Sequence, residues 1–182
     1  MTTLSDATGT WDLDQAHTVL GFSARHAMIA KVRGSFTDFS GSFTIDGANL
    51  ANSTAEVTIQ TASIDTANAD RDGHLKSADF LDVEKFPTIT FASTGIAVSG
   101  NDVTVNGNLT IHGVTKPVTV NLEFAGISVD PWGQTKIGFE GSTKVNRKEF
   151  GLVWNVALEA GGVLVDRKST RLNSSHGYIS YA

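Results

Sequence analysis

The sequence predicts an all-β domain, folded as an antiparallel up-and-down barrel with one short helix. Three observations predict this fold. The 182 residues include 18 glycines and 3 prolines, and frequent turn residues are typical of chains built from short strands. Thr, Val, Ile and Phe recur in short runs that alternate apolar and polar residues, as strands with two different faces do. The runs number about eight, the strand count at which a closed barrel can hold one small ligand.

The first clear strand lies in the segment TVLGFSARHA. One of its two sides carries Leu20, Phe22, Ala24 and His26. His26 is therefore expected on the apolar side of the strand. A long strand follows at Val32–Ile45, but its apolar phase slips by one residue near Thr37–Asp38, which predicts a β-bulge.

The same alternation places five further strands along the chain. They are expected around residues 55–59, 89–91, 103–111, 118–124 and 137–145. A last apolar piece, Leu152–Val156 followed by Gly162–Val165, should complete the series. Turn-forming segments at Ser99–Asp102 and Gly113–Pro117 separate neighbouring strands, which favours hairpins in a meander.

The one predicted helix lies near residues 71–78 and interrupts the strand series. It begins in the densest charged segment of the chain, Asp70–Lys76. A solvated helix start with Asp70 or Asp72 near the cap explains much of that charge.

Composition excludes several function classes. The chain has 14 basic and 19 acidic residues, a net charge of −5, which disfavours nucleic acid as a partner because phosphate backbones are bound by clustered Lys and Arg. With no cysteine, it has no disulfide, zinc–thiolate site or thiol nucleophile. Phosphate-binding loops and the GxSxG motif are missing, so neither a cofactor nor nucleophilic catalysis is predicted. No apolar run reaches the ~18 residues needed to span a bilayer, and no signal peptide precedes Trp11, so we expect a cytoplasmic protein that does not span a membrane.

The last 17 residues, Asp166–Ala182, differ from the rest of the chain. They are polar, follow neither period, and resemble one reading frame of a common sequencing adapter after translation. We therefore expect one barrel domain at residues 1–165 with a truncated last strand, and an artefactual, disordered tail at residues 166–182.

Four groups of residues together resemble the YceI-like family, in order and spacing, from about residue 10 to residue 165. They are Trp11–Asp14 with His17–Phe22 and His26; Arg71–Asp82 with Phe86–Phe91; Gly107–Lys116; and Arg147 with Phe150–Leu152 and Trp154. The resemblance implies an eight-stranded barrel of lipocalin type whose interior holds an isoprenoid chain, such as a polyprenyl diphosphate or a quinone. It also implies binding, sequestration or transport without catalysis, and members often form homodimers.

Candidate residues for contact with an isoprenoid or other long-chain lipid follow. For the wall of the interior they are Phe22, Phe36, Phe39, Phe43, Phe91, Leu109 and Trp154. For polar contacts they are His26, Arg71 and His74. Glycines within or beside strands would leave space along the wall or allow strong coiling of the strands; they are Gly21, Gly34, Gly41, Gly107 and Gly141.

Simpler interpretations remain open for these residues. Each aromatic side chain could serve packing alone, and His26 could be a neutral, hydrogen-bonded imidazole. No metal site is predicted, because His17, His74 and His112 lie on separate elements. Two alternative functions also remain open: an acid–base enzyme that uses His26 or Asp79 on a lipid-like substrate, and a structural barrel with a filled interior.

Overall fold

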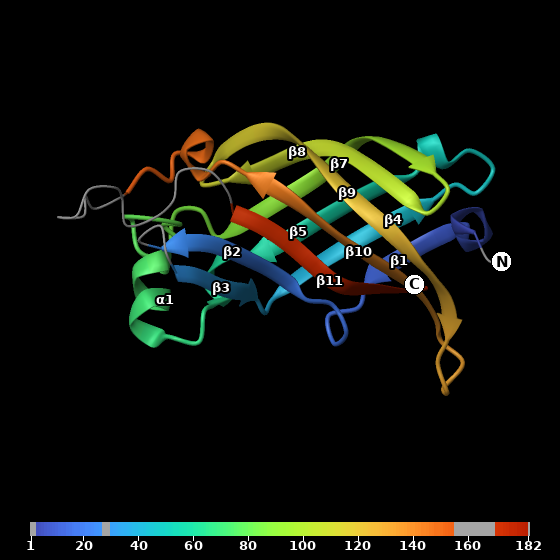
Figure 1. Ribbon diagram of the computed structural model, residues 1–182, viewed down its shortest axis with the longest axis horizontal. Coiled ribbons are helices and arrows are strands. Elements are labelled where there is room, and N and C mark those ends of the chain that lie inside the picture. Colours follow the sequence, from blue (N-terminus) through green and yellow to red (C-terminus); the bar gives the residue numbers. More distant parts are fainter. Residues whose placement is uncertain (1–2, 27–29, 155–169, 182) are drawn as a thin grey trace.

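The computed structural model describes residues 3–26, 30–154 and 170–181, with the backbone alone for residues 25, 26, 30 and 170–181. Figure 1 shows an elongated β-barrel with the helix α1 at one end and the N-terminus at the other. The strands are β1 (Gly9–Leu13), β2 (Leu20–His26), β3 (Ala30–Phe36), β4 (Phe39–Ile45), β5 (Thr54–Gln60), β6 (Ile64–Asp65), β7 (Thr88–Ser99), β8 (Asp102–Ile111), β9 (Val114–Val129), β10 (Thr135–Val145) and β11 (Thr170–Tyr181). The helices are α1 (Ala69–Lys76) and four 3₁₀ helices, η1 (Leu4–Ala7), η2 (Leu50–Asn52), η3 (Thr61–Ser63) and η4 (Arg147–Phe150).

The strands form one sheet in the order β1-β4-β5-β7-β8-β9-β10-β11-β2-β3-β6, and a further pairing of β1 with β11 closes it. All pairings are antiparallel. β1 and β2 both pair with the same edge of β11, so the two short strands together occupy one position of the barrel. β3 and β4, which pair with β2 and β1, occupy the next position together, and β6 and β5 occupy the one after that. The barrel thus has eight strand positions, and the sequence-based fold is confirmed.

Local chemistry explains the breaks between strands. The prediction of one strand at Val32–Ile45 with a β-bulge is wrong, because the chain breaks at Thr37–Asp38 into β3 and β4. At this break the Thr37 amide donates to the Ser63 carbonyl, and the Asp38 carbonyl accepts from the Gln60 amide. The predicted turns join β7 to β8 and β8 to β9. In the second of these, Gly113 has φ +71°, and a Cβ there would lie 2.6 Å from Phe86, so only glycine fits without strain.

The helix α1 begins two residues before its expected start. Asn68, rather than Asp70 or Asp72, is the N-cap, and its side chain accepts from the Arg71 amide. The Asp72 carboxylate instead accepts from the Thr66 amide and hydroxyl, which ties the helix to the segment after β6.

Two buried clusters fill the ends of the barrel. The α1-end core consists of Phe36, Phe39, Ile59, Ile64, Leu81, Ile89, Leu109, Ile111, Val145 and Phe150. The η1-end core consists of Leu4, Ala7, Trp11, Ile45, Val103, Val105, Phe124 and Ile137. Leu81 and Phe150 of the α1-end core come from segments that connect strands, and Leu4 and Ala7 of the η1-end core come from the N-terminal helix η1. Segments outside the barrel strands therefore close both ends.

The expectation of a disordered tail is wrong for residues 170–181. They form β11, which pairs with β10, β2 and β1 and occupies the closing strand position. Any extended segment can satisfy the exposed N–H and C=O groups of neighbouring strands, so backbone pairing decides here. The turn-prone residues 173–177 are accommodated by a register shift opposite Phe139 and Gly141. The apolar piece expected at Gly162–Val165 lies outside the described residues.

Candidate functional site

A cavity of about 210 Å³ lies inside the barrel between the two cores. Its lining includes Ile59 and Leu109 of the α1-end core. Leu4, Ile45 and Val105 of the η1-end core line it as well. The barrel is therefore filled at both ends and open in the middle.

The described lining is almost wholly apolar, and no charged residue belongs to it. Its polar side chains are all hydroxyls, from Thr18, Thr44, Ser53, Thr54, Ser142 and Thr143. An apolar cavity of about 150 Å³ can stay dry and bind a small hydrocarbon. The cavity therefore suits an uncharged apolar group.

Strand alternation builds this lining directly. Along β8, Val103, Val105, Gly107, Leu109 and Ile111 are buried. Three of them line the cavity, and so do the same-parity residues Val118, Val120 and Leu122 of β9. The sequence pattern identified these inward faces correctly.

Gly21 and Gly141 belong to the cavity lining, but at Gly34 and Gly107 the expectation of open space is wrong. A Cβ on Gly107 would lie 2.4 Å from Cζ of Phe91, and a Cβ on Gly34 would lie 2.5 Å from Cζ of Phe22. Each glycine lets a phenylalanine ring lie flat on the wall. The phenylalanine ring therefore occupies the space that the glycine leaves on the wall.

The structure divides the predicted wall residues between the cavity and its surroundings. Phe43, Phe91 and Leu109 line the cavity. Phe36 and Phe39 are buried in the α1-end core, and Phe22 packs on Phe36 with ring centroids 5.6 Å apart. The side chain of His26 lies outside the described residues.

The remaining candidates gather at α1, away from the cavity lining. The His74 ring lies edge-on to Trp154, with centroids 4.6 Å apart, and 5.2 Å from Phe80. His74 Nε2 is 3.2 Å from the Asp79 carboxylate. The Arg71 guanidinium donates to the hydroxyl and carbonyl of Thr66, each at 2.7 Å. These groups tie α1 and the segment at Trp154 together.

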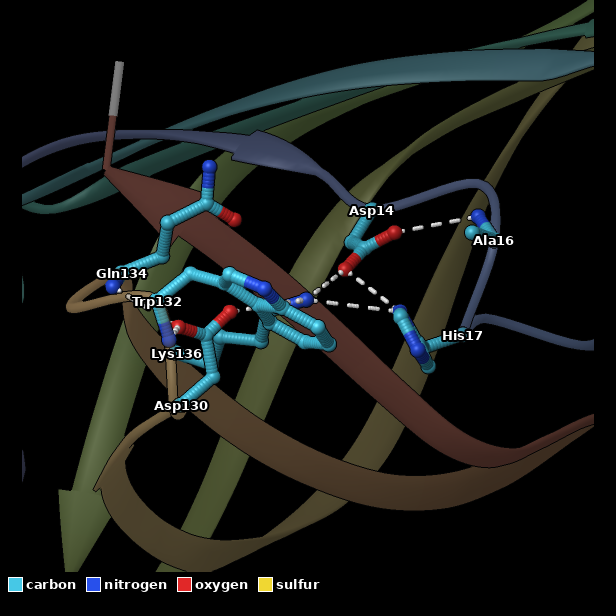
Figure 2. Close-up of polar contacts among 7 residues, drawn as sticks. All are labelled: Asp14, Ala16, His17, Asp130, Trp132, Gln134 and Lys136. Atoms are coloured by element: carbon cyan, nitrogen blue, oxygen red, sulfur yellow. Dashed lines mark hydrogen bonds and ion pairs between the residues drawn. The ribbon is translucent and has the colours of Figure 1, made fainter.

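Sequence reasoning missed a charged cluster at the connection between β1 and β2 (Figure 2). The Lys136 ammonium lies 2.6 Å from the Asp14 carboxylate, and His17 Nδ1 lies 2.8 Å from the same oxygen. Asp130 approaches Lys136 to 4.0 Å. Burial would raise the pKa of Asp14, but hydrogen bonds to Lys136 and His17, and their charges, together lower it below its ordinary value.

The only sequence signal for this cluster is the pair Asp14 and His17, three residues apart. Their partner Lys136 is 122 residues from Asp14, at a position that only the barrel's closure determines. Within the described ranges, no group of three or more His, Asp or Glu could hold a metal ion. In the same part of the chain, no helix is long and apolar enough to cross a membrane.

The family model for the YceI-like domain matches residues 11–170. The chain belongs to the YceI-like family. A UPF0312 protein of Enterobacter sp. is 46% identical over 141 residues, which is 78% of this chain and 73% of that protein. Residues 11–170, which the family model matches, contain Asp14, His17 and Lys136, so the charged cluster lies within the family domain.

Two solved structures are similar to this YceI-like domain. A Campylobacter jejuni YceI protein aligns with a TM-score of 0.64 and 30% identity, covering 82% of this chain and 88% of that one. A polyisoprenoid binding domain from Saccharophagus degradans, implicated in plant cell wall breakdown, aligns with a TM-score of 0.70 and 15% identity, covering 94% and 98%. The second likeness shows the shared fold.

Proposed function

We propose that this YceI-like protein binds a long-chain apolar lipid, a polyisoprenoid, in the barrel cavity and does not convert it chemically. The observation that carries the proposal is the cavity of about 210 Å³ whose described lining has hydroxyls as its only polar side chains. The polyisoprenoid binding domain of Saccharophagus degradans shares the fold, which supports the choice of ligand class.

Burial supplies the affinity in this proposal. Each CH₂ moved from water into an apolar site is favourable by ~0.8 kcal/mol, so a hydrocarbon chain is retained without covalent chemistry. The described lining has no charged side chain, so a diphosphate would stay at the mouth of the cavity while the chain is buried. A quinone carbonyl could accept from a lining hydroxyl such as that of Ser142.

The enzyme alternative finds no matching geometry among the described side chains. The Asp79 side chain is 58% exposed and lies beside His74 at α1, and neither residue belongs to the cavity lining. An acid–base reaction needs its base within hydrogen-bond reach of the buried substrate. The filled-barrel alternative fits only the two ends of the barrel.

Native mass spectrometry with organic extraction tests the proposal. We expect a co-purifying species with the mass of a polyprenyl or quinone compound. The variant Ala55→Leu places a larger side chain in the lining, because Ala55 is 6% exposed and faces the cavity. Ala92→Leu is the matched control, since Ala92 is exposed on the neighbouring strand β7.

Lipid should be lost from Ala55→Leu and kept by Ala92→Leu. A wild-type protein that stays free of lipid after incubation with polyprenol would contradict the proposal. Equal lipid content in the two variants would place the ligand elsewhere.

A further inference from the structure

The large apolar side chains that the structure shows exposed are concentrated on two segments. Val129 is 65% exposed and Trp132 86% exposed on the β9–β10 hairpin tip (residues 129–134), and Val19 is 49% exposed on the β1–β2 loop (residues 14–19). Figure 1 shows both segments projecting from the lower side of the barrel. We call the two segments together the apolar edge.

Lys136 at the start of β10 joins the two parts of the apolar edge. Its ammonium lies 2.6 Å from Asp14 of the loop and 4.0 Å from Asp130 of the hairpin tip. Figure 2 shows these charged groups meeting between the two segments. The loop and the tip are therefore held as one surface.

On the apolar edge, Val19, Val129 and Trp132 are more exposed to solvent than the charged side chains of Asp14, Asp130 and Lys136. Its charged side chains are largely covered: Asp14 and Lys136 are each 13% exposed and Asp130 is 14% exposed. Its tryptophan and valines face outward instead. Acids and lysines are normally the most exposed residues, and exposed apolar patches mark interaction sites.

Hydrogen bonds of the hairpin tip hold the backbone at Trp132 in place before any contact is made. The Asp130 carboxylate accepts from the amides of Trp132 and Gln134, each at 2.9 Å. The Gly133 amide donates to the Asp130 carbonyl at 3.0 Å, and Gly133 has φ +84°. A turn ordered in this way loses little conformational entropy on binding.

The apolar edge also borders the cavity. Leu13, Thr18 and Leu20, at the two ends of the β1–β2 loop, line the cavity. Thr18 is only 7% exposed and its neighbour Val19 is 49% exposed. One short loop thus carries residues that face the lipid site and a residue that faces the surroundings.

We propose that the apolar edge docks this protein on the interfacial region of a lipid bilayer, with the β1–β2 loop that borders the cavity facing the membrane. The proposal rests on the proposed function for its cargo. Tryptophan favours the membrane interface, where its ring is buried and its N–H stays hydrated. The exposed Val19, Val129 and Trp132 are uncharged, and the exposed His17 ring is paired with the Asp14 carboxylate. The chain carries a net charge of −5, so a zwitterionic bilayer suits the edge and an anionic one is repelled.

Vesicles of phosphatidylcholine with brominated acyl chains provide the test, because bromine quenches a tryptophan that enters the interface. Trp11 is 3% exposed and Trp154 is packed on His74, so quenching would report Trp132. We expect quenching in the wild type and a loss of vesicle affinity of at least about tenfold in Trp132→Ala.

Val129→Ser and Val153→Ser form a matched pair, because the two valines are 65% and 63% exposed and only Val129 lies on the apolar edge. Val129→Ser should weaken vesicle binding and Val153→Ser should not. Equal effects, or no quenching in the wild type, would overturn the docking proposal. Self-association in the absence of vesicles that Trp132→Ala abolishes would also overturn it, since a second copy would then cover the edge.

Binding of N-phenyl-1-naphthylamine, an apolar fluorophore, separates this proposal from the proposed function. The fluorophore should bind the wild type and Trp132→Ala equally. If it binds and vesicles do not, docking alone fails. If vesicles bind and the fluorophore does not, the cavity proposal fails.

Discussion

The α1 end of the barrel and the wall at the β1–β2 loop are stabilised in different ways. At the α1 end, Leu81 and Phe150 from connecting segments fill the barrel and are 7% and 1% exposed. At the β1–β2 loop the strand is interrupted, the cavity lies behind it, and a largely covered ion pair between Asp14 and Lys136 holds the wall. Apolar packing stabilises the α1 end, and an ion pair stabilises the wall at the β1–β2 loop.

This difference shows how one barrel can be solid and hollow at once. Strand alternation supplies inward apolar residues along the whole wall, and Leu109 belongs both to the α1-end core and to the cavity lining. What distinguishes the regions is whether a connecting segment adds further side chains to the interior. A wall beside an open cavity has fewer packing contacts, so its polar contacts matter more for stability.

The largest expected effect is at the packed end. Phe150→Ala should lower the free energy of unfolding by about 4 kcal/mol, because it removes a buried ring and leaves a void. Urea denaturation measures this change, with Phe150→Leu as the milder control. Lipid content per folded molecule should stay unchanged, and a loss of lipid would show that the two regions are not independent.

The next effect is at the charged wall. Lys136→Met should cost about 3 kcal/mol, because two largely covered carboxylates, Asp14 and Asp130, lose their lysine and only Asp14 keeps His17 beside it. Hydrogen exchange should increase at the amides of residues 14–20 and not at α1. Lys148→Met is the control, since Lys148 is exposed and a surface change of this kind costs less than about 0.5 kcal/mol.

A side chain added at a glycine position should have a smaller effect on stability and should also change the cavity lining. Gly107→Ala places a methyl group against the Phe91 ring and should cost about 2 kcal/mol by forcing the ring off the wall. Because Phe91 lines the cavity, the affinity for an apolar fluorophore should fall as well. Gly95→Ala is the control, since a Cβ there meets nothing within 4 Å; equal stabilities would contradict the ring's role.

The sequence predicted the features that depend on local pattern. Period-two alternation located β2 to β5 and β7 to β10, but it missed the two-residue strand β6. The slip predicted as a β-bulge at Thr37–Asp38 marks the break between β3 and β4. Alternation could not show which inward residues face a void, since Phe39 and Phe43 share the parity of one strand but only Phe43 lines the cavity. That outcome depends on side chains brought in by distant segments.

Charge pairing between residues far apart in the chain could not be predicted from the sequence either. Nothing near Lys136 indicates that it will meet Asp14, because the barrel's closure decides which strand starts lie together. The same closure placed β11 where disorder was expected. Features that depend on closure required the structure.

The smallest expected effect concerns pH and isolates the charged wall. The Asp14 pKa is lowered below 3.8 in the folded chain, so its contribution to stability is present above 3.8 and is lost as pH falls through the folded value. The difference in unfolding free energy between wild type and Asp14→Asn should therefore shrink as pH falls below 3.8. Asp6 and Asp46 also have lowered pKa values, but both variants share them and their effects cancel. A difference that stays constant with pH would mean that packing, rather than charge, holds this wall.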